Sequence, residues 1–245
     1  MKKLIIFFIL LLLPSYALDY GLYCSDLAPS KSLSGALMST TGVNFLARQI
    51  AQKEIAKALK KETGSKFDVK IGTFFAANIT QGEFSKFSAI SKNYSHDNFS
   101  AQKLTLETIC PYNKISYKND KLNYDTEMVL KFSAENNQDN LSKMLNKEIK
   151  IVNNKLVFDY KISAFGIKTK LSLRAGVDIK DNKIELCNIE LNNKTLNASK
   201  YLSLLNLTNF KVNLDKSTKA QVKLDDVKIK NSLVYLEGYV LVPKS

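Results

Sequence analysis

The sequence predicts an α+β fold: a long N-terminal helix wrapped by a strongly curved antiparallel meander sheet, with one or two short extra helices. Three observations predict it. Apolar residues recur at three- and four-residue steps over residues 43–64, which is the period of a helix. From Phe67 almost to the C-terminus they alternate with polar residues, which is the period of a strand. Dipeptides of Asn and Asp separate the strands, and such dipeptides favour two-residue hairpin turns.

The first 17 residues have the pattern of a secretory signal peptide. Lys2 and Lys3 precede an apolar run at 4–13, and small residues, Ser15 and Ala17, precede the predicted cleavage point. Ten apolar residues are too few to cross a bilayer, which takes about 20. An uncleaved anchor is the alternative. We therefore expect an exported protein of the periplasm or cell envelope, divided into a signal peptide (1–17), an N-terminal arm (18–42) and a single domain (43–245).

The helix follows the arm. Its apolar residues are predicted to form one stripe, and Thr41 is a candidate N-cap. Gly64 is placed to end the helix, and Lys60 and Lys61 in the last turns suit the negative end of the helix dipole. The predicted stripe consists of Val43, Leu46, Ala47, Ile50, Ala51, Ile55, Ala58 and Leu59.

Strands occupy most of the remaining chain. In three of them the residues expected on one face are Met128, Leu130, Phe132 and Ala134; then Leu156, Phe158, Tyr160 and Ile162; then Ile167, Leu171 and Leu173. A short helix is predicted at 137–147 and a weaker helical segment at 195–207. We expect these helices to interrupt the meander without ending it.

Four segments share one layout, a strand, a polar turn and a second strand. They start at residues 117, 151, 179 and 229, and their uneven spacing excludes a solenoid of fixed period. In the third copy, Ile184 and Leu186 have one parity, whereas Cys187, Ile189 and Leu191 have the other. A β-bulge or bend near Leu186–Cys187 is therefore expected.

The charge balance points to acidic partners. The formal charge is +13, and loss of Lys2 and Lys3 with the signal peptide leaves +11. Nucleic acid is not expected as a partner of an exported protein, so the cationic surface suggests peripheral contact with an anionic membrane surface. The alternative is a lysine-rich surface that only keeps the protein soluble.

The sequence contains no recognisable catalytic or metal-binding motif. Its one histidine, His96, is flanked by Ser95 and Asp97, but the members of a catalytic triad meet across a fold and not as chain neighbours. The three cysteines, Cys24, Cys110 and Cys187, are too widely spaced for a zinc motif. Export permits one disulfide with one thiol left over, and the pairing stays open. We therefore predict a non-enzymatic protein with no catalytic residue, cofactor or metal site.

The segment 67–91, "FDVKIGTFFAANITQGEFSKFSAIS", resembles the opening of the LmeA-like phospholipid-binding family of bacterial envelopes. Gly72, Phe74 and Phe75 stand for that family's first Gly-aromatic element, and Gly82 with Phe84 for its second, although Thr73 and Phe74 occupy the neighbourhood of the family's proline. The likeness extends through Leu141, Leu145, "IKIVNNKLVFDY" and "VKIKNSLVYLEGYV", so it spans about Val43 to Val242. It implies phospholipid binding and a fold similar to tubular lipid-binding domains, in which a curved antiparallel sheet wraps a long helix. It implies no catalytic residue.

The resulting hypothesis is an exported protein that binds phospholipid or another acyl lipid in an apolar groove, for transport or maintenance of envelope lipids. One alternative is a structural or scaffolding envelope protein with a filled core. Another, for which no motif argues, is an envelope hydrolase. The residues expected to contact acyl chains are Leu46, Ile50, Leu59, Phe132, Phe158, Tyr160, Leu171 and Leu173.

Overall fold

The computed structural model is mostly β. It describes residues 24, 43–72, 78–79, 81–96, 99–118, 121–164, 167–192, 194–195 and 221–242. The predicted signal peptide (1–17), the N-terminal arm (18–42) apart from Cys24, and the predicted helical segment 195–207 apart from Thr195 lie outside the described residues. Those predictions therefore stay predictions.

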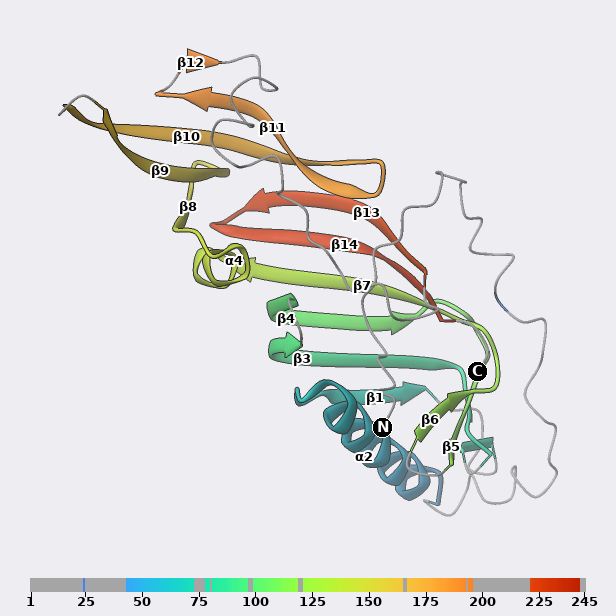
Figure 1. Ribbon diagram of the computed structural model, residues 1–245. Coiled ribbons are helices and arrows are strands. Elements are labelled where there is room, and N and C mark those ends of the chain that lie inside the picture. The colour runs from blue at the N-terminus through green and yellow to red at the C-terminus, as the bar shows by residue number, and fades with distance from the viewer. Residues whose placement is uncertain are drawn as a thin grey trace.

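The strands within the described ranges form three antiparallel sheets (Figure 1). The six-stranded sheet consists, in spatial order, of β1 (Asp68–Gly72), β3 (Lys86–His96), β4 (Phe99–Thr108), β7 (Met128–Asn137), β14 (Leu233–Val242) and β13 (Gln221–Lys230). The five-stranded sheet consists of β12 (Lys194–Thr195), β11 (Lys183–Leu191), β10 (Ile167–Lys180), β9 (Lys155–Ala164) and β8 (Ile149–Val152). The three-stranded sheet consists of β2 (Glu83–Phe84), β5 (Asn113–Lys118) and β6 (Lys121–Tyr124).

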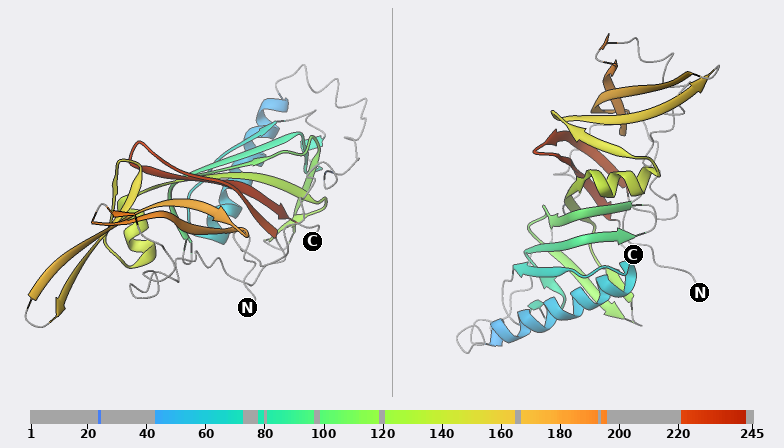
Figure 2. Two further views of the ribbon diagram at one scale, coloured as in Figure 1. Left: turned by 90° about the horizontal axis from the view of Figure 1, so that it is seen from above. Right: turned by 90° about the vertical axis from the view of Figure 1, so that its left-hand side faces the viewer.

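The molecule is elongated, with a helix at one end and the five-stranded sheet at the other. Helix α2 (Val43–Thr63) lies next to β1, the edge strand of the six-stranded sheet (Figures 1 and 2). The sheet then continues strand by strand away from the helix, to β13. The β9–β10 hairpin extends beyond the rest of the molecule at the far end (Figure 2).

The predicted α+β fold, in which a curved sheet wraps the long helix, is wrong, because the structure is mostly β. The strands divide among three sheets, and α2 packs against one edge instead of filling the interior. The apolar faces of the strands are instead buried in two clusters, which side chains from different sheets form together. Hydrophobic periodicity shows that a face is buried, but it does not show which element buries it.

The predicted single stripe of α2 is also wrong, because its apolar residues lie on two sides. Ile55 and Leu59 are buried, whereas Leu46 and Ile50 are 59% and 63% exposed. Leu46 and Ile55 are nine residues apart, which is about two and a half turns of an α-helix and places them on opposite sides. The end of the helix was predicted correctly: Gly64 has φ +74° and donates its N–H to the carbonyl of Lys60 at 2.9 Å.

The second helix is confirmed as α4 (Gln138–Leu145). The side chain of Asn137 caps its start by accepting a hydrogen bond from the Asn140 N–H at 2.9 Å. Asn146, with φ +49°, ends it in the left-handed conformation. These are the cap signals that Asn residues provide at both ends of a helix.

Three of the four predicted hairpins are confirmed with the expected turn. Both central residues have positive φ, as a type I′ turn requires, and the turns fall between β8 and β9, β10 and β11, and β13 and β14. The central pairs are Asn153–Asn154, Asp181–Asn182 and Asn231–Ser232. The central residues of the hairpin between β5 and β6, Asn119 and Asp120, lie outside the described residues.

The predicted bulge in β11 is confirmed. Arg174 of β10 pairs with Glu190, but Gly176 pairs with Cys187, so β11 carries one extra residue between these pairs. Asn188 has φ +47° there. Because the bulge changes the parity of the strand, Ile189 and Leu191 return to the face that carries Ile184 and Leu186. The apolar face of the sheet therefore continues across the bulge.

The buried side chains form two clusters. The first lies between α2, the six-stranded sheet and the three-stranded sheet, and it includes Leu59, Leu104 and Phe132. The second lies between α4, the five-stranded sheet and β14, and it includes Leu141, Phe158 and Leu173. A disulfide joins Cys24 to Cys110, and Cys187 is a free thiol.

Candidate functional site

A band of half-buried aliphatic side chains lies between the two buried clusters. Strand β10 lies close to β13, and cross-strand pairing sets Val177 opposite Leu186 and Ile179 opposite Ile184 on one face of the β10–β11 hairpin. Val227 packs against both clusters. We call this band the apolar seam; its members are Val177, Ile179, Ile184, Leu186, Val227 and Ile229.

Two side-chain hydrogen bonds join the sheets at the seam. Asn182 donates from Nδ2 to the carbonyl of Val222 at 2.8 Å, and the N–H of Leu224 donates to Asn182 Oδ1 at 2.6 Å. A side-chain amide carries the same donor and acceptor as a peptide group, so Asn182 pairs with the edge of β13 as a short added strand would. The turn residue thereby fixes the position of the β10–β11 hairpin against β13.

The structure does not bring the eight predicted lipid-binding residues together. Leu59 and Phe132 are buried in the first cluster, and Phe158 and Leu173 are buried in the second. Leu46 and Ile50 are exposed on α2. Leu171 is half-buried, and its strand neighbour is Tyr160, whose side chain lies outside the described part of the structure.

The first turn of helix α2 carries an exposed aromatic side chain beside Leu46. Phe45 and Leu46, in its first turn, are 53% and 59% exposed, and the guanidinium of Arg48 lies 5.8 Å from the centre of the Phe45 ring. A cation at this distance from an aromatic face is attracted to it. The exposed apolar side chains at the N-terminal end of α2 thus lie beside one basic side chain, Arg48.

A buried carboxylate lies in the three-stranded sheet. Asn78 Nδ2 donates to Glu83 Oε2 at 2.7 Å, and Lys114 Nζ lies 3.5 Å from Glu83 Oε1. Burial, together with the charge and hydrogen bond of Glu83, raises the pKa of Tyr112 to about 12. Because both carboxylate oxygens are engaged, this network fits a structural role, holding β2 against β5, better than a role in proton transfer.

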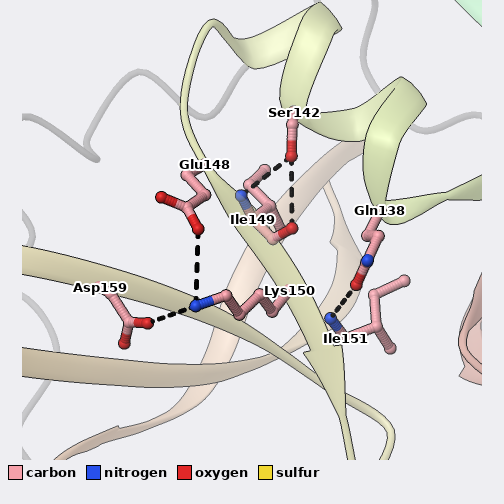
Figure 3. Close-up of polar contacts among 7 residues, drawn as sticks. All are labelled: Gln138, Ser142, Glu148, Ile149, Lys150, Ile151 and Asp159. Carbon is pink, nitrogen blue, oxygen red and sulfur yellow. Dashed lines mark hydrogen bonds and ion pairs between the residues drawn. The ribbon is translucent and has the colours of Figure 1, made fainter.

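The outer edge of β8 is protected by side chains of α4 (Figure 3). Ser142 Oγ accepts from the N–H of Ile149 at 2.9 Å and donates to its carbonyl at 3.3 Å. Gln138 Oε1 accepts from the N–H of Ile151 at 3.4 Å. These groups would otherwise be open to pairing with another strand, so α4 removes a site for edge-to-edge association.

An exposed group of ion pairs links β8 to β9 (Figure 3). Lys150 Nζ lies 2.9 Å from Asp159 Oδ2 and 3.5 Å from Glu148 Oε1. The hydrogen bond from Lys150 holds the pKa of Asp159 below its usual value. Such exposed pairs add little to stability and provide no site for a ligand.

The one histidine is the remaining candidate for chemistry. His96 is half-buried at the end of β3, opposite Phe99, and Asp97 lies outside the described residues. Among the described residues, no group of three or more His, Cys, Asp or Glu side chains could hold a metal ion. Within the same part of the chain, no helix combines the length and apolar character needed to cross a membrane.

Comparison with known proteins does not identify a relative. No family model matches the chain, and neither a search of curated proteins nor a search of solved structures finds a match. The resemblance to the LmeA-like family therefore stays a prediction.

The sequence analysis missed the residues of the seam as a site. Their signal was present in the repeated hairpins, because Val177, Ile179, Ile184 and Leu186 flank a two-residue turn and share one face. The role of Asn182 had no sequence signal, since its partners on β13 lie 40 and 42 residues further along the chain.

Proposed function

We propose that this protein binds phospholipid or another acyl lipid, without catalysing a reaction, in the periplasm or cell envelope. The observation that carries the proposal is the apolar seam. It is a row of six aliphatic side chains, between two fully buried clusters, that folding leaves only half-buried. An acyl chain lying along the seam would remove this surface from water, at about 25 cal/mol for each Å² of apolar area.

The two sheets can separate at the seam more easily than within either sheet. Strands inside each sheet are joined by backbone ladders, whereas, among the described residues, the hydrogen bonds between the β10–β11 turn and β13 are the two made by the Asn182 side chain. Loosening this joint would expose Ile179, Ile184 and Val227 without breaking a ladder. A lipid site at a joint of this kind needs no preformed tunnel.

The cysteines support an exported location. A disulfide between Cys24 and Cys110 fits an oxidising compartment such as the periplasm. This agrees with the predicted signal peptide, which precedes Cys24.

Native mass spectrometry of the mature, oxidised chain tests the proposal. The protein is purified from membranes and then offered dispersed phospholipid. We expect an adduct of one or more lipids, and we expect Ile184→Asn to weaken lipid uptake about 10- to 100-fold, because burying an isoleucine contributes about 1.5–3 kcal/mol. Val152→Asn, at a 41% exposed position on β8, is the matched control and should bind as the parent does.

The rival function is a structural envelope protein whose cores are simply filled. It is favoured by the side chains in both clusters that are entirely inaccessible, such as Leu104 and Leu173. Absence of bound lipid after purification and after lipid is offered would support this rival and overturn the proposal. Equal uptake by Ile184→Asn and Val152→Asn would exclude the seam as the binding site.

A further inference from the structure

The outer face of α2 carries a continuous row of five residues that is apolar at one end and cationic at the other. Leu46, Ile50, Lys53, Lys57 and Lys60 follow one another at steps of four, three, four and three residues. At 3.6 residues per turn these positions fall within a sector of about 80°, and the row is about 21 Å long. All five side chains are exposed. We call this row the outer stripe of α2.

The opposite side of the helix accounts for its attachment to the protein. Ile55, Ala58 and Leu59 belong to the first buried cluster, and α2 packs against β1. The outer stripe is therefore not needed to hold α2 in place. Its exposed leucine and isoleucine are more than half accessible and belong to neither of the two clusters.

The lysines of the outer stripe differ from two lysines of the six-stranded sheet, Lys103 and Lys131. On the sheet, Lys103 lies 2.9 Å from Glu135 and Lys131 lies 3.3 Å from Glu237, so these cations are matched by neighbouring carboxylates. Within the described part of the chain, no ion pair links Lys53, Lys57 or Lys60 to an acidic residue. The cationic end of the stripe is thus available to an external anion.

We propose that the outer stripe of α2 docks on the surface of an anionic phospholipid bilayer. Leu46 and Ile50, with Phe45 beside them, enter the interface between headgroups and acyl chains, while Lys53, Lys57 and Lys60 lie among the anionic headgroups. An apolar surface next to a cationic one is the pattern of helices that lie in the membrane interface. The apolar residues lie toward the N-terminus of α2 and the lysines toward its C-terminus. We therefore expect α2 to tilt, with its N-terminal half deeper in the membrane.

The charges of the outer stripe argue against a second copy of the chain as its binding partner. Two outer stripes packed together would bring cations against cations in one orientation and cations against aliphatic side chains in the other. An anionic membrane satisfies both halves at once, since it offers negative headgroups above an apolar layer. The inference does not depend on lipid uptake at the apolar seam, which lies at β10, β11 and β13.

Sedimentation with vesicles at physiological salt tests the cationic half. The mature, oxidised chain is mixed with vesicles of phosphatidylcholine alone or of phosphatidylcholine with phosphatidylglycerol. We expect binding only to the mixed vesicles. Each lysine near an anionic surface strengthens binding by about fivefold, so the triple variant K53Q/K57Q/K60Q should weaken binding on the order of 100-fold.

The matched control removes the same charge from the six-stranded sheet. Lys70, Lys86 and Lys92 are exposed on β1 and β3, and K70Q/K86Q/K92Q has the same net charge as the α2 variant. It should bind mixed vesicles within about fivefold of the parent chain, the worth of one lysine. Equal losses in the two triple variants would show that net charge alone drives binding and would overturn the assignment to α2.

The apolar half is tested by fluorescence, because the chain contains no tryptophan. Leu46→Trp introduces a single reporter on the outer stripe, and Val152→Trp introduces one at an exposed site on β8. We expect mixed vesicles to shift the emission of Leu46→Trp to shorter wavelength and to leave that of Val152→Trp unchanged. No shift for Leu46→Trp, or a shift for both reporters, would contradict insertion of this end of α2.

Two further readouts separate the possible failures. If sedimentation velocity shows a dimer that Leu46→Ser/Ile50→Ser dissociates, and vesicles are not bound, the stripe joins two copies and the proposal is overturned. Uptake of dispersed phospholipid by K53Q/K57Q/K60Q, measured by native mass spectrometry, should equal that of the parent. If the parent chain takes up no dispersed lipid but binds mixed vesicles, and K53Q/K57Q/K60Q loses that vesicle binding, the result counts against the seam and not against the outer stripe.

Discussion

The hydrogen bonds of Asn182 give the sharpest prediction about how the two sheets are joined. Asn182→Gly removes the side chain that pairs with Val222 and Leu224 and keeps a residue that readily adopts the φ of +58° found in this turn. Asn154→Gly is the matched control. Asn154 occupies the same turn position in the β8–β9 hairpin, has φ +57° and is exposed.

The magnitude follows from the two bonds. An intramolecular hydrogen bond contributes about 0.5–1.5 kcal/mol, so losing both should lower the free energy of unfolding by about 1–3 kcal/mol. Glycine also raises the entropy of the unfolded chain, but this cost is common to both variants. The difference between Asn182→Gly and Asn154→Gly therefore isolates the joint between the sheets.

Urea unfolding of the mature, oxidised chain measures the difference. Amide hydrogen exchange adds a local readout, because the Leu224 N–H donates to Asn182 and should exchange faster in Asn182→Gly than in the parent chain. If the two glycine variants lose the same stability within about 0.5 kcal/mol, a spread within which surface substitutions fall, and Leu224 keeps its protection, Asn182 does not hold the sheets together.

Three further predictions concern stability. The double variant Cys24→Ser/Cys110→Ser should lose about 4–5 kcal/mol in urea unfolding, because the disulfide closes a loop with a sequence separation of 86, and the reduced parent chain should behave like the variant. Gly238→Ala should cost about 1–3 kcal/mol, since a Cβ there would clash with the carbonyl oxygen of Lys223 on β13 and lie 2.7 and 2.8 Å from two ring carbons of Phe132; a melting temperature equal to the parent's would show that both β13 and the ring shift without cost. Burial raises the pKa of Tyr112 to about 12, so its contribution to stability is fully present below pH 10 and is lost as the pH rises through about 12; Tyr112→Phe should flatten this alkaline loss, and an unchanged pH profile would argue against it.

Local features of the fold were readable from the sequence. Helix α4, the end of α2 at Gly64 and three type I′ turns were predicted where they occur, because caps and tight turns depend on the conformations that Asn, Asp and Gly tolerate. The bulge near Cys187 was readable too, since an extra residue reverses the parity of an alternating strand.

The candidate sites were only partly readable. Leu46 and Ile50 were predicted to contact lipid, and the structure leaves them exposed, but as part of an outer surface and not of a groove. Phe132, Phe158 and Leu173 were expected to line the same groove, yet they are buried in two different clusters. An apolar residue in a periodic pattern has a face, but the pattern does not say whether a ligand, a sheet or a membrane covers it.

The sequence by itself determined where the hairpins turn, where α2 ends, where α4 lies and which residues of a strand share an apolar face. These are decided by the backbone preferences of a few neighbouring residues. The tertiary structure alone decided that the strands divide among three sheets, that α2 packs at an edge, and that Asn182 reaches β13. Each of these depends on contacts between residues distant in the chain, where many apolar faces compete for partners and shape and packing select among them.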